Sequence, residues 1–283
     1  MNNIKVFITG GTGDLGSALV KELLSRGVFV LTNGRDQTKA DSLMKELTSE
    51  QQSRFKFIVA DLSKDTPEHI ASHAYEQWNG IDVLISNVAV FAFDKDLEED
   101  EEKRNQLYST NTGGLHLAEA VAEMVTSKKE KLILCDIGST SVIADMLGEP
   151  FTDTYHYGKT KADVVRHSIE LAHSNPLVTF RGFHPGSIDG KFAQQIANKY
   201  GDTYVTSPCI TATYAIELFL KESPEPVIQE IFSSTHYFAW TDQGSWYGKE
   251  SYIADNIEGL TKERIIKIPI DGKNSFRKES DHV

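Results

Sequence analysis

Short apolar runs alternate along the chain with longer segments whose apolar residues recur every three or four positions. The runs are almost continuously apolar, which is typical of strands that are covered on both faces. They predict strands at residues 4–9, 28–33, 55–60, 82–86, 131–137 and 178–184. The segments between them predict helices at residues 15–27, 38–50, 67–78, 97–126 and 155–172. This alternation indicates an α/β fold built on a doubly wound parallel sheet.

No internal repeat and no linker rich in Pro, Gly or Ser divides the chain, so we expect a single domain over residues 1–283. The acidic run at residues 94–104 is interpreted as the solvated start of a helix. After about residue 222 the pattern weakens. We expect a substrate-side lobe over about residues 187–255, near the carboxyl edge of the sheet, and a polar tail in the last ten residues.

Composition narrows the partners and the compartment. A net charge of −12 argues against nucleic acid or an anionic membrane as the main partner, although a local basic pocket is compatible with it. The N-terminus has no signal-peptide pattern, and no apolar run approaches the roughly 20 residues that span a bilayer. Two cysteines, Cys135 and Cys209, are too few for a disulfide framework. We therefore expect a cytoplasmic protein.

A glycine-rich turn follows the first predicted strand and leads into an amphipathic helix. Gly11, Gly13 and Gly16 satisfy the spacing G-x-G-x-x-G. Glycines at these positions permit a tight turn, so that the backbone and the helix N-terminus can hold a pyrophosphate. This context predicts a dinucleotide site whose residues include Gly10, Thr12, Gly13, Asp14, Leu15 and Gly16.

The second predicted strand ends in Asn33 and Gly34, where NAD-binding proteins usually carry an acidic residue that grips the ribose. Without that carboxylate, a 2′-phosphate is not repelled, and Arg35 offers it a bidentate partner. Asn33 and Arg35 are therefore predicted coenzyme-binding residues, with NADP(H) favoured over NAD(H). An alternative is that Asp36 grips the ribose, although it also suits a helix N-cap.

The spacing Tyr-x-x-x-Lys occurs twice, in overlapping frames, as Tyr155 with Lys159 and as Tyr157 with Lys161. One helical turn places both side chains of a pair on the same face. An ammonium beside a phenol stabilises the phenolate, which makes the phenol, with its usual pKa of about 10, a usable proton-transfer group.

A stripe of small and apolar residues chooses between the frames. The stripe consists of Gly158, Ala162, Val165, Ile169 and Ala172. Tyr155 and Lys159 extend it, whereas Tyr157 leads through Lys161 toward Ser168 and a more polar surface. This pattern favours Tyr155 and Lys159 as the pair that faces a reactive site.

Several short motifs of this chain resemble those of the short-chain dehydrogenase/reductase family. They are TGGTGDLG (9–16), ADL (60–62), SNVA (86–89), STN (109–111), DIGS (136–139), YHYGK (155–159) and HPGSI (184–188). The resemblance covers roughly residues 4–190 and implies a Rossmann fold, an NAD(P) coenzyme and hydride transfer to or from a carbonyl or alcohol carbon. Counting back from HPG, the family's usual interval also falls on Tyr155.

The resemblance implies roles for individual residues. Tyr155 would exchange a proton with the substrate oxygen, Ser139 would hydrogen-bond that oxygen, with Ser141 as the alternative serine, and Lys159 would bind the nicotinamide ribose and lower the tyrosine pKa. Asn111 would hold a water that connects the lysine to solvent. The remaining coenzyme contacts implied are Asp61, Leu62, Asn87, Val88, Ala89, Pro185, Gly186 and Ile188.

Some positions depart from the family pattern. Asp14 replaces a glycine of the commonest subgroup, and Gly190 stands where a threonine often contacts the carboxamide. The glycine spacing resembles extended and atypical members and the ketoreductase modules of polyketide assembly. The leading interpretation is an NADP(H)-dependent oxidoreductase. An extended-type epimerase or dehydratase is a second interpretation, and a dinucleotide-sensing regulatory protein without turnover, against which the tyrosine-lysine pair counts, is a third.

Further expectations concern the substrate, the assembly and metals. The substrate is a small molecule, apolar or aromatic, because the loops expected around the cleft carry Phe91, Phe93, Met146, Leu147, Phe151, Phe192, Tyr200 and Tyr204. The family resemblance implies a homodimer or homotetramer that pairs helices 97–126 and 155–173. The first of these helices contains residues 115–125, whose apolar content exceeds what one buried face requires. No metal-ligand spacing is present, so no metal site is predicted.

Overall fold

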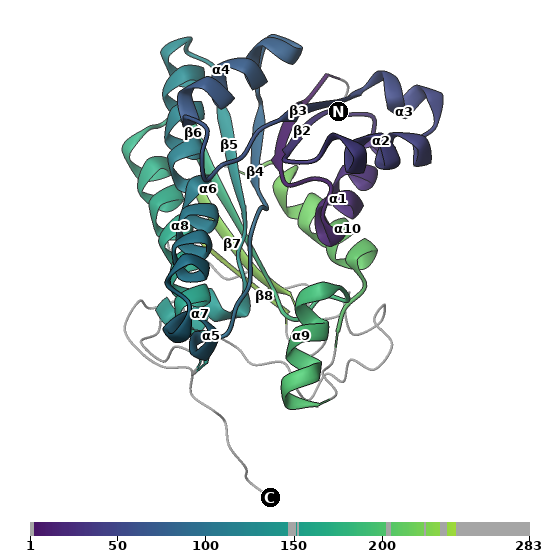
Figure 1. Ribbon diagram of the computed structural model, residues 1–283. Helices are drawn as coiled ribbons and strands as arrows, with labels where there is room; N and C mark the ends of the chain where they lie inside the picture. The colour runs from purple at the N-terminus through teal and green to yellow at the C-terminus, as the bar shows by residue number, and fades with distance from the viewer. Residues whose placement is uncertain are drawn as a thin grey trace, which may run out of the picture.

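The computed structural model describes residues 3–146, 151, 153–201, 205–223, 225–232 and 237–241, which build one continuous sheet with helices on both faces (Figure 1). In this described part of the chain the strand order is β3-β2-β1-β4-β5-β6-β7-β8. The first seven of these are parallel, and β8 runs antiparallel to β7. The strands are β1 Lys5–Thr9, β2 Phe29–Gly34, β3 Phe55–Val59, β4 Val83–Ser86, β5 Leu132–Ile137, β6 Val178–Pro185, β7 Val227–Phe232 and β8 Tyr237–Thr241.

The predicted doubly wound parallel sheet is confirmed, and β1 to β6 match the six predicted strands to within one residue at each end. Strand β7 was not predicted, although all of its residues are buried. Its sequence VIQEIF carries Gln229 and Glu230, which hide the apolar run. Gln229 is tolerated there because its Oε1 atom lies 3.1 Å from Nε2 of buried His184.

All five predicted segments are helical, two of them as two helices each, and the described residues form three further helices, at 140–146, 191–200 and 208–219, that were not predicted. Their bounds are α1 Asp14–Ser25, α2 Gln37–Glu46, α3 Ser49–Ser53, α4 Pro67–Trp78, α5 Asp94–Glu99, α6 Glu101–Ser127, α7 Thr140–Met146, α8 Tyr155–Ser174, α9 Lys191–Tyr200 and α10 Pro208–Phe219. The segment 38–50 is divided because Thr48 forms a capping box with Gln51. The segment 97–126 is divided because the Asp100 side chain caps α6 by accepting the N–H of Lys103.

Two helical layers cover the sheet. Helices α4, α6 and α8 cover one face, and α1, α2 and α10 lie over the other (Figure 1). Each layer has its own apolar core, one around Leu19, Leu23 and Phe219 and the other around Ala71, Leu117 and Val165. Burial on both faces explains why the strands are apolar throughout rather than alternating.

The shorter helices α5, α7 and α9 gather at the end of the sheet where the parallel strands terminate (Figure 1). In an open sheet of this kind, ligands bind outside the carboxyl ends of the strands, beside the point where the strand order reverses, here between β1 and β4. Of the segment predicted as a lobe, α9 lies at this edge, whereas α10 packs on α1 and β7 and β8 extend the sheet. Residues 242–255 and the polar tail lie outside the described residues. No helix of the described residues is long and apolar enough to cross a membrane.

Candidate active site

The glycine turn between β1 and α1 leaves no room for side chains at two of its glycines. A Cβ on Gly16 would lie 2.2 Å from the carbonyl oxygen of Gly10, and a Cβ on Gly11 would lie 2.4 Å from Oγ1 of Thr32. That hydroxyl instead accepts the N–H of Gly11 at 2.8 Å. Helix α1 begins at Asp14 with Gly13 as its N-cap and no side-chain cap. Its first N–H groups are thus available to an anion, so the turn fits a dinucleotide pyrophosphate.

A cavity of about 1090 Å³ opens above this turn, along the carboxyl ends of the strands. Most of the predicted coenzyme-binding residues line it, from segments far apart in the sequence. They are Gly10, Thr12, Gly13, Asp14, Leu15, Gly16, Asn33, Arg35, Asp61, Leu62, Asn87, Val88, Ala89, Pro185, Gly186 and Ile188. The fold thus brings the family-like motifs together around one cavity that is large enough for a coenzyme and a substrate.

At one end of the cavity, two basic residues lie where the second strand terminates. Arg35 and Lys39 both line the cavity. The Asp36 carboxylate caps α2, accepting the N–H of Thr38 at 2.9 Å and its hydroxyl at 2.6 Å. These hydrogen bonds lower the pKa of Asp36. The Asp36 carboxylate, which could have bound a ribose, is therefore engaged in the helix cap. Arg35 and Lys39 are the basic residues at this end of the cavity.

Asp61 also lines this end. Burial alone would raise its pKa, but hydrogen bonds from Ser63 and the charge of Arg35 outweigh that effect and lower it. Asp61 Oδ1 accepts the N–H of Ser63 at 3.0 Å and its hydroxyl at 2.7 Å. The carboxylate is thus fixed in place and ionised, and its charge is opposite to that of Arg35.

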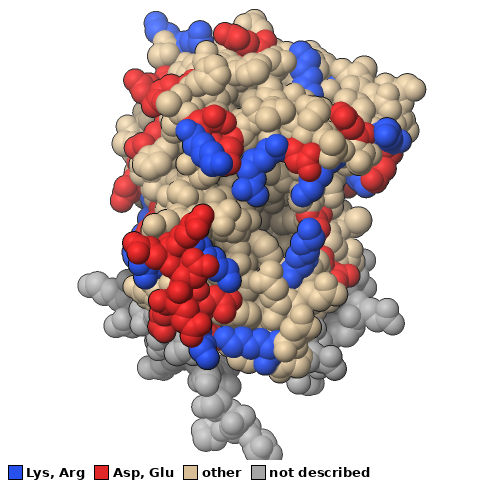
Figure 2. Space-filling model, in the orientation of Figure 1, with Lys and Arg blue, Asp and Glu red and all other residues tan. Residues whose placement is uncertain are grey.

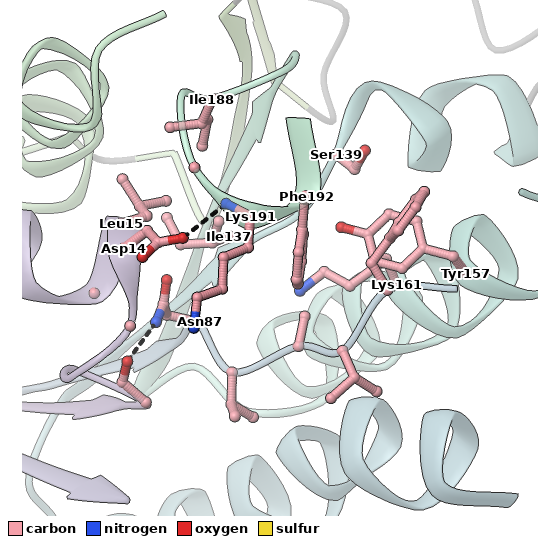
Figure 3. A pocket seen from close by; sticks show the side chains of 18 of the residues that line it. Asp14, Leu15, Asn87, Ile137, Ser139, Tyr157, Lys161, Ile188, Lys191 and Phe192 are labelled. Atoms are coloured by element: carbon pink, nitrogen blue, oxygen red, sulfur yellow. Dashed lines mark hydrogen bonds between the residues drawn. The ribbon is translucent and has the colours of Figure 1, made fainter. Parts of the chain in front are cut away.

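At the other end, α8 brings Tyr157 and Lys161 into the cavity rather than the predicted pair (Figure 3). Tyr157 is 9% exposed and Lys161 is 5% exposed. Tyr155 is 42% exposed and does not line the cavity, and Lys159 pairs with Asp163 at 3.4 Å on the surface. The prediction that Tyr155 and Lys159 face the cleft is therefore wrong, and the structure places the second Tyr-x-x-x-Lys pair there instead.

The apolar stripe was identified correctly, but the buried face of α8 is wider than the stripe. Ser168, which had marked a polar surface, is fully buried, and so is Thr160. Their polar groups face other buried polar groups, because Thr160 Oγ1 accepts from Asn111 Nδ2 at 3.0 Å and Ser168 acts on Asp136, whose pKa it lowers. The interval from the reactive tyrosine to Pro185 is accordingly two residues shorter than the count from the family pattern assumed.

Tyr157 is a neutral phenol in this environment. Burial raises its pKa to about 12, and a hydrogen bond with Ser139 acts in the opposite direction. The expected lowering of the phenol pKa is not found. A phenol that retains its proton at neutral pH is suited to donate it.

Below the cavity floor, Lys161 and Asp136 form a buried pair of opposite charge. Burial lowers the pKa of Lys161 to about 8, against the attraction of Asp136. Burial likewise raises the pKa of Asp136 to about 7, against hydrogen bonds from Ser168 and Ser86 and the charge of Lys161. Each charge supports the other in a site that penalises both. Asp136, within the DIGS motif, was not predicted as a site residue.

Both candidate serines line the cavity beside α8. The Ser139 hydroxyl donates to Ser141 Oγ at 3.3 Å and accepts the N–H of Ser141 at 3.2 Å. Gly158 allows this approach, since a Cβ there would lie 3.2 Å from the Ser141 Cβ. Of the two serines, Ser139 is the one that hydrogen-bonds with Tyr157.

Asn111 lies beneath the cavity wall rather than in it. Its Oδ1 accepts the N–H of Val90 at 2.8 Å, and its Nδ2 donates to Val90 O and Thr160 Oγ1 at 3.0 Å each. Both amide hydrogens are therefore used by the protein. The side chain ties the loop after β4 to α8 beside Lys161. The role of Asn111 in holding a water stays a prediction.

Aromatic side chains wall the cavity near Tyr157. Of the eight predicted aromatic and apolar residues, the cavity is lined by Phe91, Phe93, Phe151, Phe192 and Tyr200. The Phe91 ring lies edge-on to the Tyr157 ring, with centroids 5.1 Å apart. Leu147, Tyr204 and the side chain of Met146 lie outside the described residues.

The surface around the cavity differs from the overall acidic balance. Figure 2 shows a hollow on this face with Lys and Arg side chains on its borders, and an acidic cluster over α5 and the start of α6. The acidic cluster belongs to the run 94–104, of which Glu98, Glu99, Glu101 and Glu102 are exposed. A local basic border thus coexists with a net charge of −12. Within the described residues, no three His, Cys, Asp or Glu side chains cluster in a way that could hold a metal ion.

The parallel sheet, the glycine turn and the Tyr157–Lys161 pair define a dinucleotide-dependent α/β oxidoreductase. The family model described as short chain dehydrogenase matches residues 5–201. An uncharacterised oxidoreductase of Schizosaccharomyces pombe is 29% identical over 205 residues, covering 69% of this chain and 78% of the yeast protein. The chain belongs to the short-chain dehydrogenase/reductase family, and it is an NAD(P)-dependent enzyme.

Solved structures share the fold at low identity. An alcohol dehydrogenase from Thermococcus sibiricus, complexed with 5-hydroxy-NADP, superposes with a TM-score of 0.67 at 19% identity, covering 82% of this chain and 96% of that one. The actinorhodin polyketide ketoreductase with NADPH gives a TM-score of 0.66 at 19% identity, covering 79% and 93%.

Among the residues in or beneath the cavity that were not predicted are Lys39, Asp136 and Lys191. Lys39 follows Arg35 by four residues, close enough that a second basic residue near the end of β2 could have been noticed. Asp136 was hidden because an acidic residue at a strand end is unremarkable until its burial is known. Lys191 follows the Pro-Gly motif on a helix that was not predicted.

Proposed function

We propose that the protein is an NADP(H)-dependent carbonyl reductase or alcohol dehydrogenase acting on an apolar or aromatic substrate. The observation that carries the proposal is the position of Tyr157 and Ser139 in the same cavity as the glycine turn and Arg35. A coenzyme held on the turn would leave its reactive end toward α8. Phe91, Phe192 and Tyr200 supply apolar surface for the rest of the substrate.

When bound, the nicotinamide coenzyme supplies or accepts the hydride. Tyr157, protonated at neutral pH because burial raises its pKa, donates a proton to the carbonyl oxygen of the substrate. Ser139 hydrogen-bonds that oxygen and holds it beside the phenol. Lys161 binds the ribose hydroxyls and offers a positive charge to the phenolate that remains. In the oxidative direction the same phenolate takes the proton from the alcohol.

Preference for NADP(H) is supported by two basic residues and by an occupied carboxylate. Arg35 and Lys39 line the adenosine end, and Asp36 is held in the cap of α2. A 2′-phosphate would meet these two positive charges, while the two carboxylates that also line this end, Asp36 and Asp61, accept hydrogen bonds from Thr38 and Ser63. One charge-assisted contact contributes about 1.5–3 kcal/mol, which is about 10- to 150-fold in affinity.

Coenzyme titration and substrate screening test the proposal together. Wild type should bind NADPH more tightly than NADH, and Arg35→Ala should lose most of that difference while keeping its NADH affinity. NADPH consumption should then be found with members of a panel of apolar ketones and aldehydes. Equal affinity of wild type for the two coenzymes would contradict the NADP(H) assignment, and an inert panel would contradict carbonyl reduction.

A further inference from the structure

Four basic residues line the cavity, and three of them have a place in the proposed function. Arg35 and Lys39 lie at the adenosine end, and Lys161 lies beside Tyr157. The fourth, Lys191, lies between them, at the start of α9. No role for it follows from the motifs of the sequence.

The backbone of Lys191 is fixed against the glycine turn. Its N–H donates to Oδ2 of Asp14 at 3.0 Å, and Asp14 is the first residue of α1. Gly190 makes this approach feasible, since a Cβ there would lie 2.7 Å from the same oxygen. From that anchor the Lys191 side chain extends into the cavity (Figure 3). Among the described residues, no carboxylate forms an ion pair with its ammonium.

A pyrophosphate bound at the glycine turn would lie beside a carboxylate, and the ammonium of Lys191 is placed to offset the repulsion between them. A pyrophosphate on the N-terminus of α1 carries two negative charges and lies next to the carboxylate of Asp14. Like charges at that distance repel, and the hydrogen bond to Lys191 N–H removes only part of the Asp14 charge from the cavity. The other basic lining residues serve either end of the dinucleotide. A cation over the turn would offset this repulsion.

We infer that Lys191 binds the coenzyme pyrophosphate, with Asp14 positioning it through the backbone hydrogen bond. The inference rests on the proposed function, because it presumes that a dinucleotide occupies the glycine turn. It assigns to Lys191 an affinity contribution that NADPH and NADH share. Arg35, in contrast, acts on the 2′-phosphate that only NADPH carries.

The test separates these two contributions by isothermal titration calorimetry at low and at high salt. The ligands are NADPH, NADH and adenosine 2′-monophosphate, which lacks a pyrophosphate. Lys191→Met should weaken both dinucleotides by the same factor, at least about tenfold at low salt, and should leave the monophosphate unchanged. Lys191→Arg should stay close to wild type. Lys21→Met, which removes an exposed lysine paired with Glu46 outside the cavity, controls for the change in net charge.

Three results would overturn the inference. Lys191→Met could bind both dinucleotides within twofold of wild type, or lose affinity only for the two ligands with a 2′-phosphate, or match the loss seen in Lys21→Met. If Lys191→Met does not fold, Lys191→Gln makes the same measurement, because it also removes the charge. Wild type that binds neither dinucleotide would refute the proposed function itself, and this inference with it.

Discussion

The side chain of Asp94 caps the helix that begins at Tyr155, with Oδ2 accepting the Tyr155 N–H at 2.8 Å. Oδ1 accepts the N–H of His156 at 3.0 Å. The cap places Tyr155 in the first turn of α8, where its side chain is exposed. Tyr157, two positions later, faces the cavity. An acidic residue of the run 94–104 therefore fixes which Tyr-x-x-x-Lys frame meets the cavity.

Exchanging the two tyrosines for phenylalanine tests that frame. Tyr157→Phe should reduce turnover by about 10²–10⁴-fold, because it removes the proton donor while the ring keeps its packing. Tyr155→Phe should change turnover by only a few-fold. Coenzyme affinity, measured by titration, should remain near wild type in both variants. An active Tyr157→Phe beside an inactive Tyr155→Phe would return the assignment to the first frame.

Asp136→Asn should lower the pH at which Lys161 loses its proton. Burial already lowers the pKa of Lys161 to about 8, and the Asp136 carboxylate is the charge that opposes this effect. Without that carboxylate the pKa falls further, so coenzyme affinity should begin to decline at lower pH than in wild type. Titrating NADPH from pH 6 to pH 9 checks this. Asp163→Asn, next to surface Lys159, is the matched control and should leave the profile unchanged.

Acid should destabilise the fold partly through His184. Burial lowers the pKa of this fully buried imidazole from 6.5 to about 4, against the hydrogen bond with Gln229. A depressed folded-state pKa gives stability that is complete above pH 6.5 and is lost as the pH falls through 4. The contribution is about 3 kcal/mol at most.

The measurement is the free energy of unfolding between pH 7 and pH 4 by urea titration. His184→Gln should reduce the slope with pH, whereas exposed His69→Gln should not. Asp136 acts with the opposite sign over part of this range, since burial raises its pKa to about 7. The comparison is therefore between variants rather than with an absolute slope. Parallel profiles for wild type and His184→Gln would refute the assignment.

Assembly into a homodimer or homotetramer stays a prediction, but the apolar content of residues 115–125 no longer supports it. The apolar residues of 115–125 are all buried or half-buried within the single chain, because α6 packs against both α4 and α8. No apolar excess is left to require a partner. The expectation thus rests on family membership alone. Light scattering at micromolar concentration should give a mass of two or four chains, and a monomer would contradict it.

The sequence predicted the fold well because burial on both faces makes parallel strands mostly apolar, and in β1 to β6 the polar residues are too few to obscure that pattern. The glycine turn was equally readable, since sterics at Gly16 admit no other residue. The frame of α8 was not. Choosing between Tyr155 and Tyr157 depended on whether Ser168 faces water or Asp136, and a polar side chain looks the same in a sequence in either case.

Gly190 lies against Asp14, so two departures from the family pattern, Asp14 in place of a glycine and Gly190 in place of a threonine, depend on each other. Gly190→Thr alone would drive a Cβ toward the Asp14 carboxylate, 2.7 Å away, and disturb its bond to Lys191. Asp14→Gly alone would leave the Lys191 N–H without that acceptor. With Asp14→Gly present, the added Cβ at position 190 no longer meets a carboxylate, so the effects of the two changes on stability should be non-additive by about 0.5–3 kcal/mol in a double-mutant cycle. We therefore expect positions 14 and 190 to be coupled, so that the effect of a side chain at position 190 depends on whether position 14 carries a carboxylate.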